Sequence, residues 1–181
     1  MKPHEYRDLI AAYIDVHYAQ HDVVVYTEVS LGKTIIGKSR KLDIFVLRKS
    51  DQRALAVEAK YQEVQGTTDE KIPYALQDLE ALWIPGCLAY AGPGWSKGVL
   101  HTLEGSMRAV HCLPEVPDLA RTTDTRELDH VLAAVFGFWD QVIPEERLFV
   151  RAPQLSLTLR GPRKAEARPT VEKKKVADEE G

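Results

Sequence analysis

The sequence predicts an α/β fold in which helices flank a central mixed β-sheet. Apolar residues recur at helical spacing over residues 3–20 and again over 126–142. Between these segments lie short runs rich in β-branched residues, separated by turns that contain glycine, proline or charged residues. The chain therefore reads as helix, three strands, helix and strand, followed by further helices and a strand. Such alternation is typical of a sheet covered by helices.

The first half of the chain supplies one helix and three strands. Leu9 and Tyr13 recur on one side of the helix predicted over 3–20, and Pro3 suits a first helical turn. The strands are predicted at 22–32, 41–48 and 53–61. The polar segment "KSDQ" between the last two predicts a β-hairpin.

The second half is predicted to add three helices and two strands. An apolar stripe that ends at Trp83 predicts a helix within 67–83, and Pro73 restricts where that helix can begin. The remaining predicted elements are a strand at 86–92, a helix that ends near Arg108, a strand at 109–114 and a helix at 126–142.

Length and composition predict one domain over residues 1–150 and a charged extension over 151–181 that is flexible from about residue 160. The formal net charge of -3 gives no global signal for nucleic acid or membrane. Cys87 and Cys112 lack a metal-binding spacing and are expected to be buried free thiols. Neither a signal segment nor a run of membrane-spanning length is visible, so we expect a cytoplasmic protein without a membrane partner.

Charged residues interrupt two of the predicted strands. Glu58 and Lys60 share one face of the strand at 53–61, and the hairpin brings Asp43 of the preceding strand beside Glu58. Two carboxylates this close repel each other unless a cation lies between them. Oxygen ligands with open positions suit Mg²⁺, with Mn²⁺ able to substitute. Lys60 can then position a water molecule or stabilise charge that develops on a phosphate. The alternative is a structural Glu–Lys pair at a strand end.

This constellation resembles the PD-(D/E)xK nuclease superfamily. Asp43 matches the first acid and Glu58-Ala59-Lys60 matches the "ExK" triplet, although Leu42 stands where the motif has proline. The resemblance covers roughly residues 3–91 and implies a restriction-endonuclease-like core with the element order αβββαβ. It implies a metal ion held by Asp43 and Glu58, with the carbonyl of Ala59 as an additional ligand.

Further residues are candidates for the same site. Several branches of the superfamily use a glutamate of the first helix, which Glu5 matches by order, and Glu28 is the other candidate for a third acidic ligand. Gln62 faces the same side as Lys60 and is expected to support the site. The alternatives are a first-turn glutamate for Glu5, an outward-facing strand residue for Glu28 and a solvated strand end for Gln62.

Basic residues gather around the two acids and are expected to contact the phosphate backbone of DNA without reading its sequence. This set comprises Lys33, Lys38, Arg40 and Lys41, together with Lys71 of the "DEK" segment at 69–71. Lys71 is alternatively a solvated residue at a helix start. A homodimer is expected because cutting both strands needs two active sites. The apolar segment 128–139 is a candidate interface or part of the domain's own core.

The sequence thus predicts a Mg²⁺-dependent DNA endonuclease of restriction or repair type. A Holliday-junction resolvase is a less favoured alternative, because "GTTDEK" at 66–71 resembles restriction-type branches. A non-catalytic nucleic-acid-binding module that retains the nuclease fold is the alternative from another class. A glycosidase-like carboxylate pair does not account for Lys60.

Overall fold

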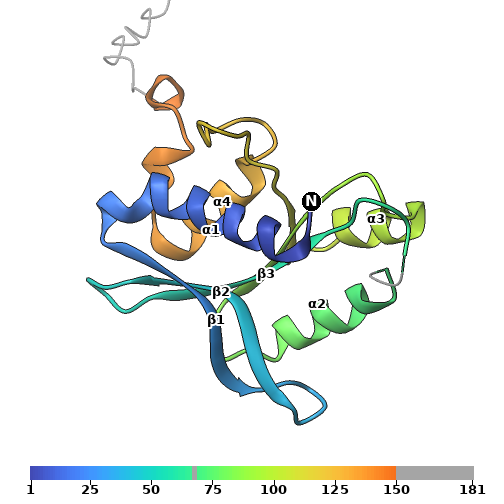
Figure 1. The fold of residues 1–181 in the computed structure, drawn as a ribbon. Coiled ribbons are helices and arrows are strands. Elements are labelled where there is room, and N and C mark those ends of the chain that lie inside the picture. The colour runs from blue at the N-terminus through green and yellow to red at the C-terminus, as the bar shows by residue number, and fades with distance from the viewer. Residues whose placement is uncertain (67–68, 150–181) are drawn as a thin grey trace, which may run out of the picture. The chain divides into compact units, whose positions relative to one another are not determined.

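Five strands form one mixed sheet in the computed structural model, which describes residues 1–66 and 69–149 (Figure 1). They follow the order β1-β2-β3-β4-β5, so every strand pairs with its neighbours in the chain. The strands are β1 (Val23–Lys33), β2 (Ser39–Arg48), β3 (Ala54–Tyr61), β4 (Gly86–Ala91) and β5 (Ala109–His111). β1, β2 and β3 pair antiparallel, whereas β4 and β5 continue the sheet in parallel. The mixed sheet predicted from the sequence is confirmed.

Helices cover both faces of this sheet (Figure 1). They are α1 (Pro3–Tyr18), α2 (Ile72–Glu80), α3 (Lys97–Glu104) and α4 (Arg126–Phe136). α1 and α4 bury their apolar residues against one face, in a core that includes Tyr6, Ile44, Val57 and Leu132. α2 and α3 enclose a smaller core on the other face. The element order therefore contains the predicted αβββαβ core and confirms the restriction-endonuclease-like class.

Two predicted helices differ from the observed ones at their ends. The helix predicted over 126–142 stops at Phe136, because Gly137 takes a left-handed conformation with φ 80° that ends the helix. α2 begins at Ile72, and Pro73 lies in its first turn, where the missing N–H leaves no bond unmade.

The apolar segment 128–139 belongs largely to the domain's own core. Leu128, Leu132 and Phe136 of α4 and Phe138 beyond it are buried in the same cluster as α1. Of the two interpretations of this segment, the structure therefore favours internal packing over a dimer interface.

Residues Met1–Arg147 form one compact unit. The predicted extension at 151–181 lies outside the described residues, as do Thr67 and Thr68 of the "GTTDEK" segment. Cys87 and Cys112 are both buried and free, as expected, and burial raises the pKa of the Cys87 thiol to about 12. Across the described ranges, no helix has the length and apolar character needed to cross a membrane.

Candidate active site

The three charged residues predicted to interrupt the strands lie where β2 and β3 separate. The last residue pair between these strands is Ile44 with Val57. Asp43 and Glu58 would form the next pair, but the strands no longer pair there. Asp43 then replaces the missing strand contact with its side chain, since its Oδ2 accepts a hydrogen bond of 3.0 Å from the backbone N–H of Ala59. The separation of the strands opens space beside Asp43 without leaving this N–H unpaired.

The backbone of Ala59 faces the opened side of β3. The N–H groups of Ala56 and Gln62 donate to the carbonyls of Pro85 and Ala91, so even-numbered residues of β3 turn their backbone groups towards β4. Backbone groups alternate in direction along a strand. The N–H and C=O of Ala59 therefore point away from β4, towards Asp43, which leaves this carbonyl available as an oxygen ligand.

Lys60 lies between the two carboxylates. Its Nζ is 2.5 Å from Oε1 of Glu58 and 3.7 Å from Oδ2 of Asp43. The side chains of Glu58 and Lys60 are 25% and 22% exposed, so the pair is largely withdrawn from water while still reachable from it. The ammonium occupies the position of the cation that two close carboxylates require.

The surroundings of this cluster shift the pKa values of both members. Burial raises the pKa of Glu58, the Lys60 ammonium opposes this rise and the Asp43 carboxylate adds to it. Burial lowers the pKa of Lys60, but Glu58 and Asp43 together outweigh burial, so the pKa lies above its ordinary value. At neutral pH Lys60 is therefore a charged hydrogen-bond donor.

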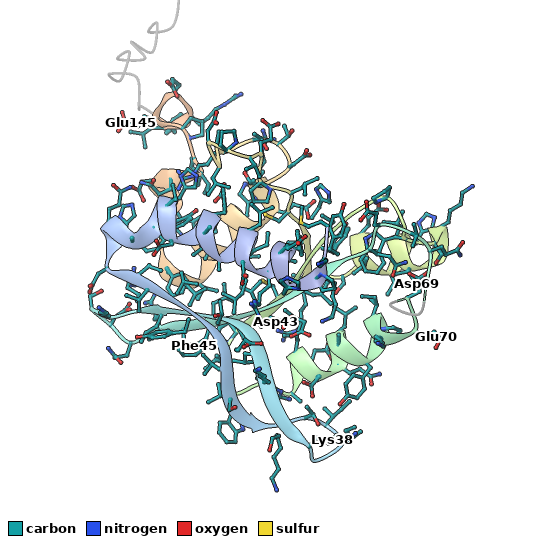
Figure 2. All side chains as sticks on the ribbon, in the orientation of Figure 1. Lys38, Asp43, Phe45, Asp69, Glu70 and Glu145 are labelled. Atoms are coloured by element: carbon teal, nitrogen blue, oxygen red, sulfur yellow. The ribbon has the colours of Figure 1, made fainter. Side chains whose placement is uncertain are left out.

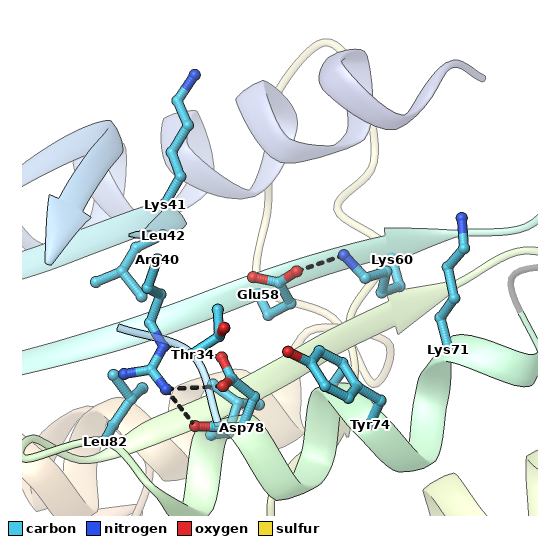
Figure 3. A pocket seen from close by; sticks show the side chains of 12 residues that line it. Thr34, Arg40, Lys41, Leu42, Glu58, Lys60, Lys71, Tyr74, Asp78 and Leu82 are labelled. Carbon is cyan, nitrogen blue, oxygen red and sulfur yellow. Dashed lines mark hydrogen bonds and ion pairs between the residues drawn. The ribbon is translucent and has the colours of Figure 1, made fainter. Parts of the chain in front are cut away.

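Two hollows meet at Lys60. One is a cavity of about 390 Å³ between the β1–β2 hairpin, β3 and α2, with Glu58, Lys60, Lys71 and Tyr74 in its wall (Figure 3). The other, of about 350 Å³, lies beside the start of α1. Its lining consists of Pro3, His4, Arg7, Asp43, Ala59, Lys60, Tyr61 and Lys71. The cluster can thus be approached from both hollows, with Lys60 and Lys71 at their junction.

A divalent cation fits this set of donors. Two carboxylates that already share one cation, and a backbone carbonyl that points the same way, are the hard oxygen ligands that Mg²⁺ and Mn²⁺ prefer. Within residues 1–66 and 69–149, no group of three or more His, Cys, Asp or Glu side chains is placed to hold a metal ion. Mg²⁺ is commonly held by one or two carboxylates with substrate phosphate and water, so two acids are sufficient.

The structure does not bring Glu5 to this cluster. Oε2 of Glu5 instead accepts a hydrogen bond of 2.8 Å from the backbone N–H of Lys2, in a capping box at the start of α1. This hydrogen bond lowers the pKa of Glu5. The arrangement corresponds to the alternative interpretation, a glutamate that stabilises the first turn of its helix.

The carboxylate of Glu28 is held by two cations at the rim of the site. Its position in β1 lies opposite Asp43, since the neighbouring pairs are Thr27 with Ile44 and Val29 with Leu42. However, Glu28 has a positive φ of 58°, which breaks the regular alternation of side chains along the strand. Its Oε1 lies 3.0 Å from Nζ of Lys41 and 3.0 Å from Nη1 of Arg7.

Gln62 anchors the segment that carries Lys71. Its amide Nε2 donates to Oδ1 of Asp69 and to the carbonyl of Gly94, each at 2.7 Å. Asp69 opens the short 3-10 turn Asp69–Lys71 that leads into α2. Gln62 lines neither hollow, and its hydrogen bond to Asp69 ties it to this turn, whose Lys71 lies at the rim of both.

The predicted phosphate-contacting residues fall into two groups. Lys41 and Lys71 line the cavity that holds Glu58, where a substrate can reach them. Arg40 lines it too, but its buried guanidinium is already engaged by Asp78, with two hydrogen bonds of 2.8 Å. Lys33 and Lys38 lie farther out, at the turn of the β1–β2 hairpin, where Figure 2 shows Lys38 pointing into solvent.

Arg7, Tyr74 and Asp78 also lie at the site and were not predicted from the sequence. Arg7 lines the hollow beside Asp43, and Tyr74 and Asp78 line the larger cavity. Helical spacing contains part of the signal, because Tyr74 and Asp78 are four residues apart and so lie on one side of α2. Which side faces β3 depends on how α2 packs on the sheet, and that depends on tertiary structure.

Comparison with known protein families agrees with this geometry. A family model described as a PD-(D/E)XK nuclease superfamily domain matches residues 2–139, a range that contains Asp43 and the Glu58-Ala59-Lys60 triplet. The chain belongs to the PD-(D/E)XK nuclease superfamily. Nucleases of this superfamily generally use divalent metal ions. No curated protein matches the chain significantly.

Proposed function

We propose that this protein is a Mg²⁺-dependent DNA endonuclease that hydrolyses phosphodiester bonds, with Mn²⁺ able to replace Mg²⁺. The observation that supports it best is the cluster of Asp43, Glu58 and Lys60 where β2 and β3 separate, at the junction of two hollows with cationic residues. A structural Glu–Lys pair has no need of a second carboxylate or of an adjoining cavity.

Each residue of the cluster has a role in this proposal. Asp43, Glu58 and the carbonyl of Ala59 hold the metal ion, which supplies Lewis-acid activation of the phosphate and of the attacking water when it is bound. Lys60 orients that water or donates to a phosphate oxygen as negative charge develops on it. Lys41 and Lys71 bind neighbouring phosphates and align the backbone.

A restriction-type or repair-type activity remains the preferred form. Cutting both strands of a duplex requires two active sites, so we expect a homodimer, and we expect it to act in the cytoplasm. A Holliday-junction resolvase is the alternative within the class, and the choice of DNA substrate distinguishes the two.

The test is a cleavage assay on supercoiled, linear, single-stranded and branched DNA with Mg²⁺, Mn²⁺ or EDTA. We expect cleavage with either metal, none with EDTA, and a loss of at least about 10²-fold in the Lys60→Ala variant. Circular dichroism of this variant serves as the control for folding.

A non-catalytic nucleic-acid-binding module would give a different result. It would bind the same DNA without a metal, cut none of the substrates and show no catalytic change on replacement of Lys60. That combination would contradict the proposed hydrolysis while leaving the superfamily assignment intact.

A further inference from the structure

A second cavity, separate from the two hollows that meet at Lys60, adjoins the candidate active site and is walled by the β1–β2 hairpin and the end of α2. Its volume is about 390 Å³. It is lined by Leu31, Gly32 and Lys33 of β1, Arg40 of β2, and Ala81, Leu82 and Trp83, which follow α2. Arg40 and Leu82 line the active-site cavity as well, so the two cavities are neighbours. A polynucleotide with one phosphate beside Glu58 can therefore place a neighbouring nucleotide in this cavity.

Trp83 is unusual for so large an apolar side chain because 89% of it is exposed. The other two tryptophans are more covered, with Trp95 7% and Trp139 49% exposed. A freely exposed indole beside an apolar cavity is typical of a binding surface, since the ring offers a large flat face at small conformational cost.

The charge around Trp83 indicates which kind of partner fits. Lys33 lines the cavity and Lys38 lies across the hairpin turn from it, and neither has an ion-pair partner in the described part of the chain. Nucleic-acid bases stack on exposed aromatic rings while lysines hold the neighbouring phosphates. A peptide or lipid partner would leave the continuity with the phosphate-binding cavity unexplained.

The hairpin turn adds an apolar edge to the same surface. Ile35 and Ile36, 45% and 60% exposed, project between Lys33 and Lys38. The turn is held in place, because the N–H of Ile35 donates to Oδ1 of Asp78 and the N–H of Thr34 donates to the carbonyl of Lys38, each at 2.8 Å. Apolar side chains held in a fixed position can insert between neighbouring bases of a nucleic acid and keep one base unstacked.

We propose that the substrate of this protein carries unpaired nucleotides next to the phosphate that is cut, and that one unpaired base stacks on Trp83 in this second cavity. The proposal rests on the proposed nuclease function and narrows it to the repair type, with a single strand, flap or other branched end as the substrate instead of the continuous duplex that a restriction-type enzyme cuts. Arg40, fixed by Asp78, separates the bound base from the phosphate at Glu58.

The test measures binding by fluorescence anisotropy in EDTA, so that cleavage does not enter the result. The probes are a labelled single-stranded oligonucleotide of about 15 residues, a blunt duplex of the same length and that duplex with a short single-stranded flap. Trp83→Ala removes the stacking surface, Trp83→Phe retains a smaller one, and Trp139→Ala is the matched control on another surface of the protein.

We expect Trp83→Ala to weaken binding of the single strand and the flap about tenfold, since one base–aromatic stack carries an effect of this order. Binding of the blunt duplex should change by no more than about twofold, Trp83→Phe should restore most of the loss and Trp139→Ala should change nothing. The intrinsic fluorescence of the wild-type protein should be quenched by the single strand, and this quenching should disappear in Trp83→Ala.

Equal losses on all three probes, or no loss on any, would overturn the proposal. So would a smaller sedimentation mass of Trp83→Ala with unchanged oligonucleotide binding, which would make this surface a contact between two copies of the chain. Failure of the nuclease proposal is separate. Trp83-dependent binding without metal-dependent cleavage contradicts the nuclease, whereas cleavage without Trp83-dependent binding contradicts only the stacking site.

Discussion

Two carboxylate sites in this molecule differ in how their oxygens are satisfied. Asp129 of α4 is 4% exposed, and its Oδ1 and Oδ2 accept hydrogen bonds of 2.8 and 2.7 Å from the hydroxyls of Tyr18 and Tyr13. Glu58 has the ammonium of Lys60 as its partner and shares it with Asp43, beside two open hollows. Both sites are withdrawn from water, but only the second leaves oxygen atoms available.

Asp129 therefore stabilises the fold, whereas Glu58 and Asp43 keep oxygen atoms that can bind a further group. Burial, with Asp129 adding to it, raises the pKa of Tyr18, so this hydroxyl keeps its proton and continues to donate. At the other site the protein holds two like charges close together, which costs free energy unless a cation offsets it. Such an arrangement is expected where a cation is to be bound.

The largest expected effect is on catalysis, from Glu58→Gln. The amide keeps the shape of the side chain but cannot hold a divalent cation as a carboxylate does, so cleavage should fall by at least about 10²-fold. The free energy of unfolding should change by less than about 1 kcal/mol, because one of two repelling carboxylates is removed. Cleavage rates and urea unfolding of the same preparations measure both; a normal cleavage rate would exclude Glu58 as a metal ligand.

The converse effect is expected from Asp129→Ala. Two buried tyrosine hydroxyls lose their acceptor, and each unsatisfied group costs about 1–3 kcal/mol, so the free energy of unfolding should fall by about 2–6 kcal/mol. Cleavage at a temperature where the variant remains folded should be retained. Asp129→Asn, which keeps one acceptor oxygen, should lose less stability. Loss of cleavage in a folded Asp129→Ala protein would contradict the assigned structural role.

A smaller effect, dependent on pH, is expected from Asp78→Asn. The hydrogen bonds from Arg40 lower the pKa of Asp78, so its ion pair contributes stability above the ordinary aspartate pKa near 3.9 and loses it as pH falls through the lower folded-state value. The variant should be less stable than the wild type by about 1 kcal/mol at pH 7. The two should converge once the pH falls below the folded-state pKa of Asp78. Urea unfolding across this range measures the difference, and a constant gap at every pH would contradict it.

The sequence was sufficient to predict the fold class and the central pair of acids, for reasons that are local. β-branched runs that alternate with amphipathic segments identify strands and helices, and the period of two along β3 places Glu58 and Lys60 on one face. The short turn between β2 and β3 fixes their register, which brings Asp43 beside Glu58.

What sequence reasoning did not determine depends on backbone irregularities and on packing. Glu28 has the register position of a third acid, yet its carboxylate pairs with Lys41 and Arg7, and no local pattern in the sequence predicts these partners or the positive φ of Glu28. The second cavity exists because Trp83, three residues beyond the end of α2, is not covered by other side chains. Helical periodicity predicted the opposite, because it placed Trp83 in the buried stripe.

Metal binding at Asp43 and Glu58 is tested most directly by titrating Mn²⁺ into the wild type, Glu58→Gln and Asp129→Asn, with free Mn²⁺ measured by its paramagnetic resonance. We expect one Mn²⁺ to bind to the wild type and to Asp129→Asn, and the affinity of Glu58→Gln to be lower by about tenfold or more. No binding to the wild type, or equal binding to Glu58→Gln, would contradict the claim that Asp43, Glu58 and Lys60 surround a metal-dependent active site.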